Sequence, residues 1–297
     1  MSFEVTFAVL KIGLLCLNLV LFVTAILALK KKVKELDKGE EERKGGVLLL
    51  IAHPDDEAMF FLPFLKNIQN QSREIFLECF SIGDSEGKGE TRRRELLESC
   101  KHLGIKEENC IIHNHPQLKD SLSEKWKEEL VSEKIEDTLR RNPTISSVIT
   151  FDEKGKSSLP FCLSWRVALS SNILKKGVSG HPNHISLHNA SKLVYQSLKR
   201  RREAKIEEKK EKEEKLLFFK LESVSLLRKY SSFLDIPFSF FLSVLPISNE
   251  STLHFTNASF FPSWRQMSIH NSQFVWYRKL SVLFSRYSYI NTLLPLQ

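Results

Sequence analysis

The fold prediction for this chain starts from the stretch VLLLIAHPDDEAMFF, residues 47–61. Six apolar residues lead into His53 and, after one proline, into three consecutive acids. A short apolar run bounded by polar residues is typical of a buried strand. Acidic side chains are rarely buried unless they are paired or bound to a metal. The stretch therefore predicts a strand at 47–52 that delivers His53, Asp55 and Asp56 to a functional site.

Apolar runs and amphipathic segments alternate along the rest of the chain. The runs predict strands, and the segments between them predict helices. The predicted strands are 47–52, 75–82, 110–113 and 147–151, and the predicted helices are 57–69, 91–103, 124–141 and 183–198. This alternation predicts an α/β fold with a Rossmann-like, mostly parallel sheet and helices on both faces. Ligands of such sheets bind beyond the carboxyl ends of the strands, where His53 and Asp152 are expected.

The N-terminus predicts a membrane anchor. Residues 12–29 are eighteen residues without a charge, and the basic cluster KKKVK follows at 30–34. A helix needs about 20 apolar residues to cross a bilayer, and a signal peptide carries its basic residues before the apolar core. We therefore expect one uncleaved N-terminal transmembrane helix in 1–30, a charged linker at 31–46 and a domain facing the cytoplasm. A buried core helix is the alternative.

Composition excludes several classes of protein. The formal net charge is +8, but it is spread over short clusters and no nucleic-acid-binding motif accompanies it, so we expect no nucleic-acid partner. The five cysteines have no paired spacing, which argues against a disulfide framework and a cysteine zinc site and is typical of a reducing compartment. We expect one domain over 47–297.

A second histidine-rich stretch, GVSGHPNHISLH at 177–188, contains His181 and His184. Two imidazoles and one carboxylate, from His53, Asp56 and His184, suit a catalytic zinc ion with an open position for water, although another divalent metal would also fit. Asp55 would then act as general base. His181 would stabilise the oxyanion and protonate the leaving amine.

Two other interpretations of these residues stay open. Asp55 or Asp56 could simply cap the helix that follows, because Asp is favoured at helix N-termini. His188 lies one helical turn after His184 and is the rival metal ligand.

The segments AHPDDE, GETRRREL, VITFD and GVSGHPNH resemble the N-acetylglucosaminyl-phosphatidylinositol de-N-acetylase family, within the LmbE-like zinc deacetylases. The resemblance covers nearly all of the chain after residue 46. It implies the roles just given for the zinc ligands, Asp55 and His181, and it implies that Arg92 and Glu95 hold the sugar hydroxyls. It also implies zinc-dependent deacetylation of N-acetylglucosaminyl-phosphatidylinositol, the second step of GPI-anchor biosynthesis, at the cytoplasmic face of the endoplasmic reticulum membrane. We infer no obligate protein partner from the sequence.

The substrate's phosphate requires cationic donors. The candidates are the run Arg92, Arg93 and Arg94, or the set Arg278, Lys279 and Arg286.

Two stretches disturb the order. Residues 199–215 are almost entirely charged and predict a solvated helix or a disordered excursion. Residues 156–175 are apolar and form an atypical insertion before the second histidine pair. Because this insertion sits where catalytic histidines must be aimed, a catalytically impaired membrane scaffold or subunit is an alternative function. A deacetylase of a soluble N-acetyl sugar is another.

Overall fold

The computed structural model describes residues 45–154, 181–207, 216–244, 252–257 and 259–296. The predicted anchor at 1–30, nearly all of the linker and the insertion at 156–175 lie outside these residues. Within the described ranges, no helix combines the length and the apolar character that crossing a bilayer requires.

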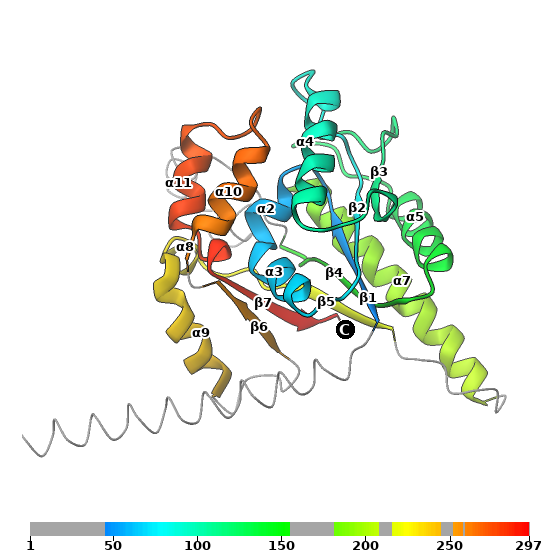
Figure 1. The fold of residues 1–297 in the computed structure, drawn as a ribbon. Coiled ribbons are helices and arrows are strands. Elements are labelled where there is room, and N and C mark those ends of the chain that lie inside the picture. The colour runs from blue at the N-terminus through cyan, green and yellow to red at the C-terminus, as the bar shows by residue number, and fades with distance from the viewer. Residues whose placement is uncertain (1–44, 155–180, 208–215, 245–251, 258, 297) are drawn as a thin grey trace, which may run out of the picture.

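The described residues form one seven-stranded sheet with the strand order β3-β2-β1-β4-β5-β7-β6 (Figure 1). The strands are β1 Gly46–Ile51, β2 Ile75–Cys79, β3 Cys110–Ile112, β4 Ile145–Phe151, β5 Leu217–Leu221, β6 Leu253–Thr256 and β7 Ile290–Pro295. Strands β1 to β5 pair in parallel, whereas β7 pairs antiparallel with both β5 and β6. The predicted mostly parallel sheet is confirmed, and all six residues of its interior strand β1 are buried.

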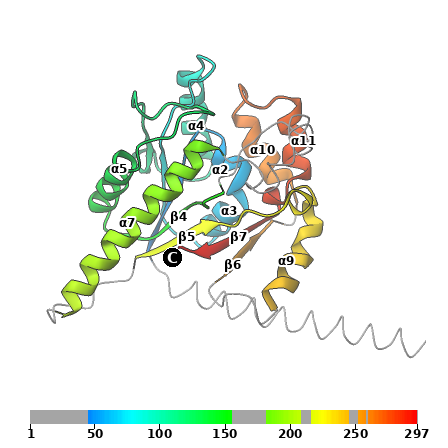
Figure 2. The same cartoon turned by 180° about the vertical axis from the view of Figure 1, so that it is seen from behind.

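Helices cover both faces of the sheet, as predicted (Figures 1 and 2). One face carries α2 Asp56–Phe60, α3 Leu62–Asn70, α4 Gly89–His102 and α10 Phe261–Ile269, and the other carries α5 Glu128–Arg141 and α7 Pro182–Glu207. The remaining helices, α8 Leu226–Lys229, α9 Asp235–Val244 and α11 Trp276–Phe284, lie at the β6 side of the molecule. Short 3-10 turns occur at η1 Glu107–Asn109, η2 Ser232–Leu234 and η3 Arg286–Ser288.

The helix predicted at 57–69 is two helices, α2 and α3, which meet at Phe61. Pro63 lies in the first turn of α3. Because proline has no amide hydrogen and clashes with the preceding turn, it is tolerated there but not inside a continuous helix. The break turns α3 onto the sheet and keeps α2 as a separate helix at the end of β1.

Other boundaries also differ from the prediction. The helix expected from residue 124 begins at Glu128, because Trp126 is held by tertiary contacts instead. Its backbone N–H donates to Ser186 Oγ at 3.2 Å, and its indole N–H donates to the carbonyl of Lys119 at 2.8 Å. The strand expected at 75–82 ends at Cys79. Helix α7 continues through Glu207, so the first part of the charged stretch 199–215 is a helix, and 208–215 lies outside the described residues.

Candidate metal centre and active site

The end of β1 places His53 and Asp56 at the carboxyl edge of the sheet. Asp56 Oδ2 accepts hydrogen bonds from the backbone amides of Ala52 at 3.1 Å and His53 at 2.9 Å. The carboxylate therefore folds back over the strand end, 3.8 Å from Nδ1 of His53. Asp55 occupies the N-cap position of α2, but its side chain makes no capping hydrogen bond. The contacts of both acids thus differ from those of a helix cap.

His184, in the first turn of α7, completes the predicted ligand set. Its Nε2 lies 3.2 Å from Asp56 Oδ2, and its ring stacks on Phe151 at 3.9 Å. Although the imidazole is buried, neither of its nitrogens has a hydrogen-bond partner among the described residues. Donor atoms of His53, Asp56 and His184 all lie within 4.8 Å of one another. An orphaned imidazole beside a second imidazole and a carboxylate fits a divalent metal such as zinc.

A second donor set shares His53 and adds two residues, His181 and Asp120. Oδ1 of Asp120 lies 3.2 Å from Nε2 of His53 and 3.8 Å from Nε2 of His181. The side-chain nitrogen Nδ2 of Asn183 also lies 3.0 Å from Nε2 of His53. Neither Asp120 nor Asn183 was predicted from the sequence as a site residue. The available signal for Asp120 was its place in the loop after the third parallel strand, at the same edge of the sheet.

Burial keeps the imidazoles of His53 and His181 neutral. The pKa of His181 is lowered to about 4, mainly by burial and to a smaller extent by the nearby His184. The pKa of His53 is lowered well below its usual value, mainly by burial and to a smaller extent by His181 and His184. Neutral imidazoles have a lone pair for a cation or for a proton in transfer. Burial also raises the pKa of the Asp120 carboxyl.

Asp55 has a strained backbone and two arginine partners. Its φ of 105° lies in the left-handed region, which a residue with a Cβ adopts at a cost of about 1–3 kcal/mol and which is frequent at functional sites. Its amide donates to Glu57 Oε2 at 3.2 Å. Its Oδ2 contacts Nη1 of Arg278, on α11, and lies 3.4 Å from Nη2 of Arg92. The two guanidinium groups hold the carboxylate beside the histidine cluster.

Arg92 reaches the site from the first turn of α4. Its guanidinium donates to the carbonyls of Gly83 and Pro54, each at 2.8 Å, and lies 3.3 Å from Asp120 Oδ2. Although burial alone would lower it, the pKa of Arg92 is raised by Asp55 and Asp120. Gly83 makes room for this side chain, because a Cβ at Gly83 would lie 2.5 Å from Cζ of Arg92.

Glu95, the other predicted sugar-binding residue, lies one turn further along α4. Its carboxylate accepts from the backbone N–H and the hydroxyl of Ser272, each at 2.7 Å. These bonds tie α4 to the segment between α10 and α11, and neither candidate donor set includes Glu95.

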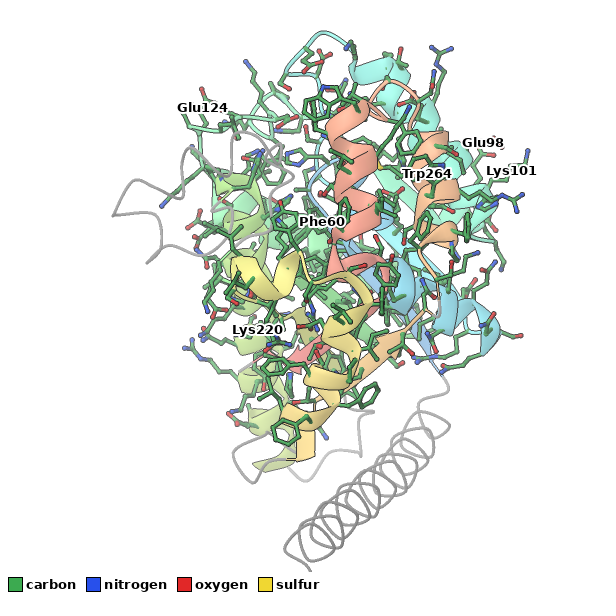
Figure 3. The ribbon with its side chains drawn as sticks, turned by 90° about the vertical axis from the view of Figure 1, so that its left-hand side faces the viewer. Phe60, Glu98, Lys101, Glu124, Lys220 and Trp264 are labelled. Carbon is green, nitrogen blue, oxygen red and sulfur yellow. The ribbon has the colours of Figure 1, made fainter. Side chains whose placement is uncertain are left out.

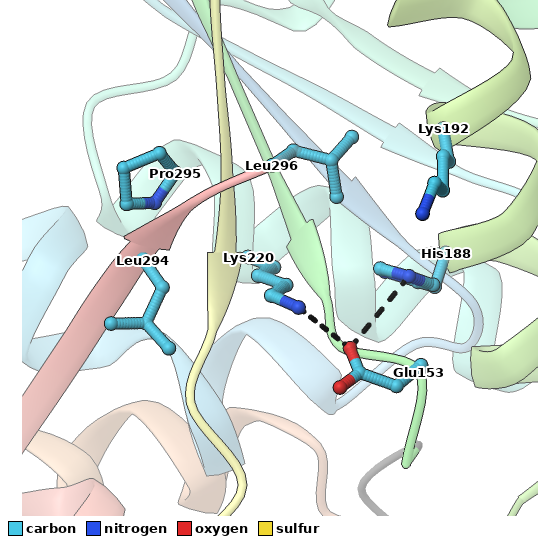
Figure 4. A pocket seen from close by; sticks show the side chains of 7 residues that line it. All are labelled: Glu153, His188, Lys192, Lys220, Leu294, Pro295 and Leu296. Atoms are coloured by element: carbon cyan, nitrogen blue, oxygen red, sulfur yellow. Dashed lines mark hydrogen bonds and ion pairs between the residues drawn. The ribbon is translucent and has the colours of Figure 1, made fainter. Parts of the chain in front are cut away.

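His188, the rival ligand, is outside both donor sets. Its Nδ1 lies 3.0 Å from the carbonyl of Phe151, and its Nε2 lies 3.8 Å from Glu153. It lines a separate pocket with Lys192 and Lys220 (Figure 4). The structure therefore separates His188 from the cluster around His53.

The cationic candidates fall into different environments. Arg92 and Arg278 lie at the site, and Lys279 is exposed on α11. Arg93 and Arg94 are exposed on α4. Arg286 is fully buried and donates to Asp235, Ser239 and Thr292, so its guanidinium connects elements of the fold.

A mostly parallel α/β sheet with buried histidine and aspartate donors at its carboxyl edge is typical of metal-assisted hydrolytic enzymes. The family described as PIG-L: GlcNAc-PI de-N-acetylase matches residues 48–162. A Dictyostelium discoideum protein named probable N-acetylglucosaminyl-phosphatidylinositol de-N-acetylase is 33% identical over 86% of this chain and 94% of its own length. The Bos taurus N-acetylglucosaminyl-phosphatidylinositol de-N-acetylase is also 33% identical, over 94% of this chain and 96% of its own.

A solved structure, that of a conserved protein from Thermus thermophilus, shares the fold with a TM-score of 0.51 and 15% identity. The match covers 85% of this chain and 95% of that protein. The chain belongs to the N-acetylglucosaminyl-phosphatidylinositol de-N-acetylase family. It is therefore a deacetylase, a hydrolase that acts on an amide.

Proposed function

We propose that this protein hydrolyses the N-acetyl group of N-acetylglucosaminyl-phosphatidylinositol in a zinc-dependent reaction, the second step of GPI-anchor biosynthesis. The observation that carries the proposal is the convergence of His53, Asp56 and His184 from two distant parts of the chain, with Asp55 and His181 beside them. The names of the relatives supply the substrate.

A bound zinc ion would act as a Lewis acid toward the acetamide and lower the pKa of water to about 7. Asp55 takes the proton from the attacking water, since Arg92 and Arg278 hold its carboxylate in place. His181, a neutral imidazole, donates a hydrogen bond to the developing oxyanion. The new bond joins the water oxygen to the acetyl carbon. The proton that Asp55 took from the water then passes to His181 and from His181 to the amine nitrogen while the C–N bond breaks. The free amine and acetic acid leave, the acid loses its proton to solvent as acetate, and Asp55 and His181 return to their starting states.

Binding of the rest of the substrate also follows from charge. Arg92 lies close enough to Asp55 and Asp120 to hold sugar hydroxyls beside the reacting amide. The sugar-binding role of Glu95 stays a prediction. Arg278 and Lys279, consecutive on α11, are the candidate partners of the lipid phosphate. Arg278 lies at the site and Lys279 is exposed next to it, so the two cations can bind a phosphate that extends from the site toward the surface.

We place the enzyme in the endoplasmic reticulum membrane with this domain on the cytoplasmic side, on the basis of the apolar segment 12–29 and the basic cluster after it. The chain carries acceptor patterns for N-glycosylation at Asn70, Asn189, Asn249 and Asn257. In this orientation none is modified. A mass shift that glycosidase treatment removes would refute the orientation.

The experiment is a deacetylation assay on the full chain in membranes, with metal analysis of the same preparations. The wild type should carry about one zinc ion per chain and lose activity with a chelator. His53→Ala and Asp56→Ala should lose zinc and activity together. His188→Ala is the matched control and should retain both, because His188 lies outside the donor sets.

Hydrolysis of soluble N-acetyl sugars in preference to the lipid-linked substrate would move the protein to the soluble-sugar alternative. A wild type that binds no zinc and hydrolyses nothing would contradict the proposal and favour the scaffold alternative.

A further inference from the structure

Large apolar side chains are exposed on the segment from α8 to α9 and on α11. Trp276 and Phe241 are each 60% exposed, and Phe233 is 57% exposed. We call this set the apolar face: Leu227, Phe233, Leu234, Phe238, Phe241, Trp276, Leu280 and Phe284. Soluble proteins tolerate single exposed apolar residues, whereas a contiguous group marks an interaction surface.

Helix α11 has one exposed apolar side, and a residue on another side contacts the active site. Trp276, Leu280 and Phe284 are spaced four residues apart, so they form one exposed stripe. Arg278, on another side of the same helix, reaches Asp55, and Val282 is buried. The helix that carries the exposed stripe therefore also contacts the catalytic carboxylate.

Helix α9 is inverted, with its polar side inward. Asp235 and Ser239 are buried, whereas Phe238 and Phe241 are exposed. Asp235 accepts from Arg228 at 2.8 Å and from Arg286 at 2.6 Å, and Ser239 Oγ donates to Asp235 at 2.7 Å. This network clamps α9 to the domain by its polar side. A surface helix in water has the opposite arrangement.

The two parts of the apolar face adjoin each other. Ser232 Oγ, in η2, donates to the carbonyl of Leu283 in α11 at 3.3 Å, and the rings of Phe233 and Tyr289 are 6.2 Å apart. Figure 3 looks onto this side, with α8, α9 and α11 toward the viewer. The exposed residues of both segments thus belong to one surface.

We propose that the apolar face docks on the surface of a lipid bilayer, with its side chains at the boundary between headgroups and acyl chains. Trp, Phe and Leu beside basic residues are the mixture that interfacial helices use. Here Arg228 lies 5.0 Å from the Phe238 ring and Lys279 lies 5.2 Å from the Phe274 ring.

The sequence before the domain supports a bilayer as the occupant. Residues 12–29 are uncharged and apolar, and residues 31–46 join them to the domain. Sixteen residues span at most about 55 Å when extended, so a segment inserted in a bilayer would keep the domain beside the same bilayer. Docking goes beyond the proposed function, because it does not depend on which amide is hydrolysed.

The test uses the full chain in vesicles whose phosphatidylcholine carries bromine on the acyl chains, which quenches nearby tryptophan. The chain has four tryptophans and none precedes residue 45, so the N-terminal segment contributes no emission. The share of emission due to Trp276 is the difference between the wild type and Trp276→Phe. We expect bromine to quench this share and aqueous iodide to leave it unchanged. Leu193→Trp in the Trp276→Phe background is the control, and iodide should quench it. Leu193 is exposed on α7, and α7 lies on the other side of the molecule from α9 and α11 (Figures 1 and 2).

Three results would overturn the docking proposal. Quenching of the Trp276 share by iodide and not by bromine would place the face in water. If the Trp276 emission is protected from both quenchers and deletion of residues 156–175 ends this protection, then that segment covers the apolar face. Protection that disappears on dilution of the protein in the vesicles would identify a second copy as the occupant.

Activity gives a second readout. Replacing Trp276, Leu280 and Phe284 together with serine should raise KM about tenfold for a lipid-linked substrate in vesicles, with no change for a short-chain analogue in water. An equal effect on both substrates would contradict docking. Absence of all hydrolysis in the wild type would contradict the proposed function and leave the fluorescence test intact.

Discussion

At the scale of single residues, the site depends on how buried polar groups are paired. The buried carboxylate of Glu57 accepts from Ser99 Oγ at 2.5 Å, lies 2.5 Å from His270 Nε2 and receives the amide of Asp55. His270 lowers the pKa of Glu57 against the effect of burial, and Glu57 raises the pKa of His270 against the same effect. Because Glu57 also accepts the backbone N–H of Asp55, this ion pair helps to hold the strained backbone of Asp55 in place.

Gly83→Ala tests whether the position of Arg92 matters. The new Cβ would overlap the guanidinium, so Arg92 should move away from Asp55 and Asp120. A misplacement of about 1 Å can cost about a hundredfold in rate, and we expect a loss of kcat/KM of that order in the deacetylation assay.

Gly87→Ala is the matched control for this substitution. Gly87 has the same positive φ of 69°, and a Cβ there meets no atom within 4 Å. Gly87→Ala should lower the thermal stability through backbone strain, and it should keep the activity. Equal activity of the two variants would contradict the role given to Arg92.

At the scale of elements, the sequence predicted what periodicity and motifs encode. The strand at 47–52 and the two histidine-containing segments were found because apolar runs and HPDDE and HPNH spacings are local signals. The break at Phe61 and the delayed start of α5 depend on tertiary contacts, such as those of Trp126. Asp120 was missed because no motif in its loop marks it. Only its place in the loop after the third parallel strand could have pointed to it, and the fold brings it to His53.

Lys229, at the end of α8, should make stability depend on pH. Burial lowers its pKa from 10.5 to about 8. The charged form is therefore penalised in the folded state, fully so below pH 8, and the unfolded state binds more protons between pH 8 and 10.5. Stability should rise with pH across this window, by about 3 kcal/mol at most.

Lys229→Met removes this dependence. The variant should be more stable than the wild type at pH 7, with the difference disappearing near pH 10.5, in thermal unfolding of the solubilised full chain. Lys192→Met, at an exposed position on α7, is the control and should change neither the midpoint nor its slope with pH. A difference between wild type and Lys229→Met that is constant with pH would contradict this account.

At the scale of the whole molecule, the parallel half of the sheet assembles the chemistry and the antiparallel half carries the apolar face. Residues that follow β1, the loop after β3 and the start of α7 meet at one edge. Helix α11 joins the two halves, since Arg278 enters the site while Trp276 is exposed. An enzyme whose substrate has lipid tails benefits from this arrangement, because docking would hold the site beside the bilayer.

The most direct test of this account is X-ray absorption spectroscopy at the zinc edge on the full chain loaded with one zinc ion. We predict two imidazole nitrogens with the remaining ligands oxygen, at the distances typical of zinc, about 2.0–2.2 Å. In His184→Ala one imidazole should disappear, whereas His188→Ala should reproduce the wild-type spectrum. A sulfur ligand, or a spectrum that His184→Ala leaves unchanged, would contradict convergence of His53, Asp56 and His184 on one ion.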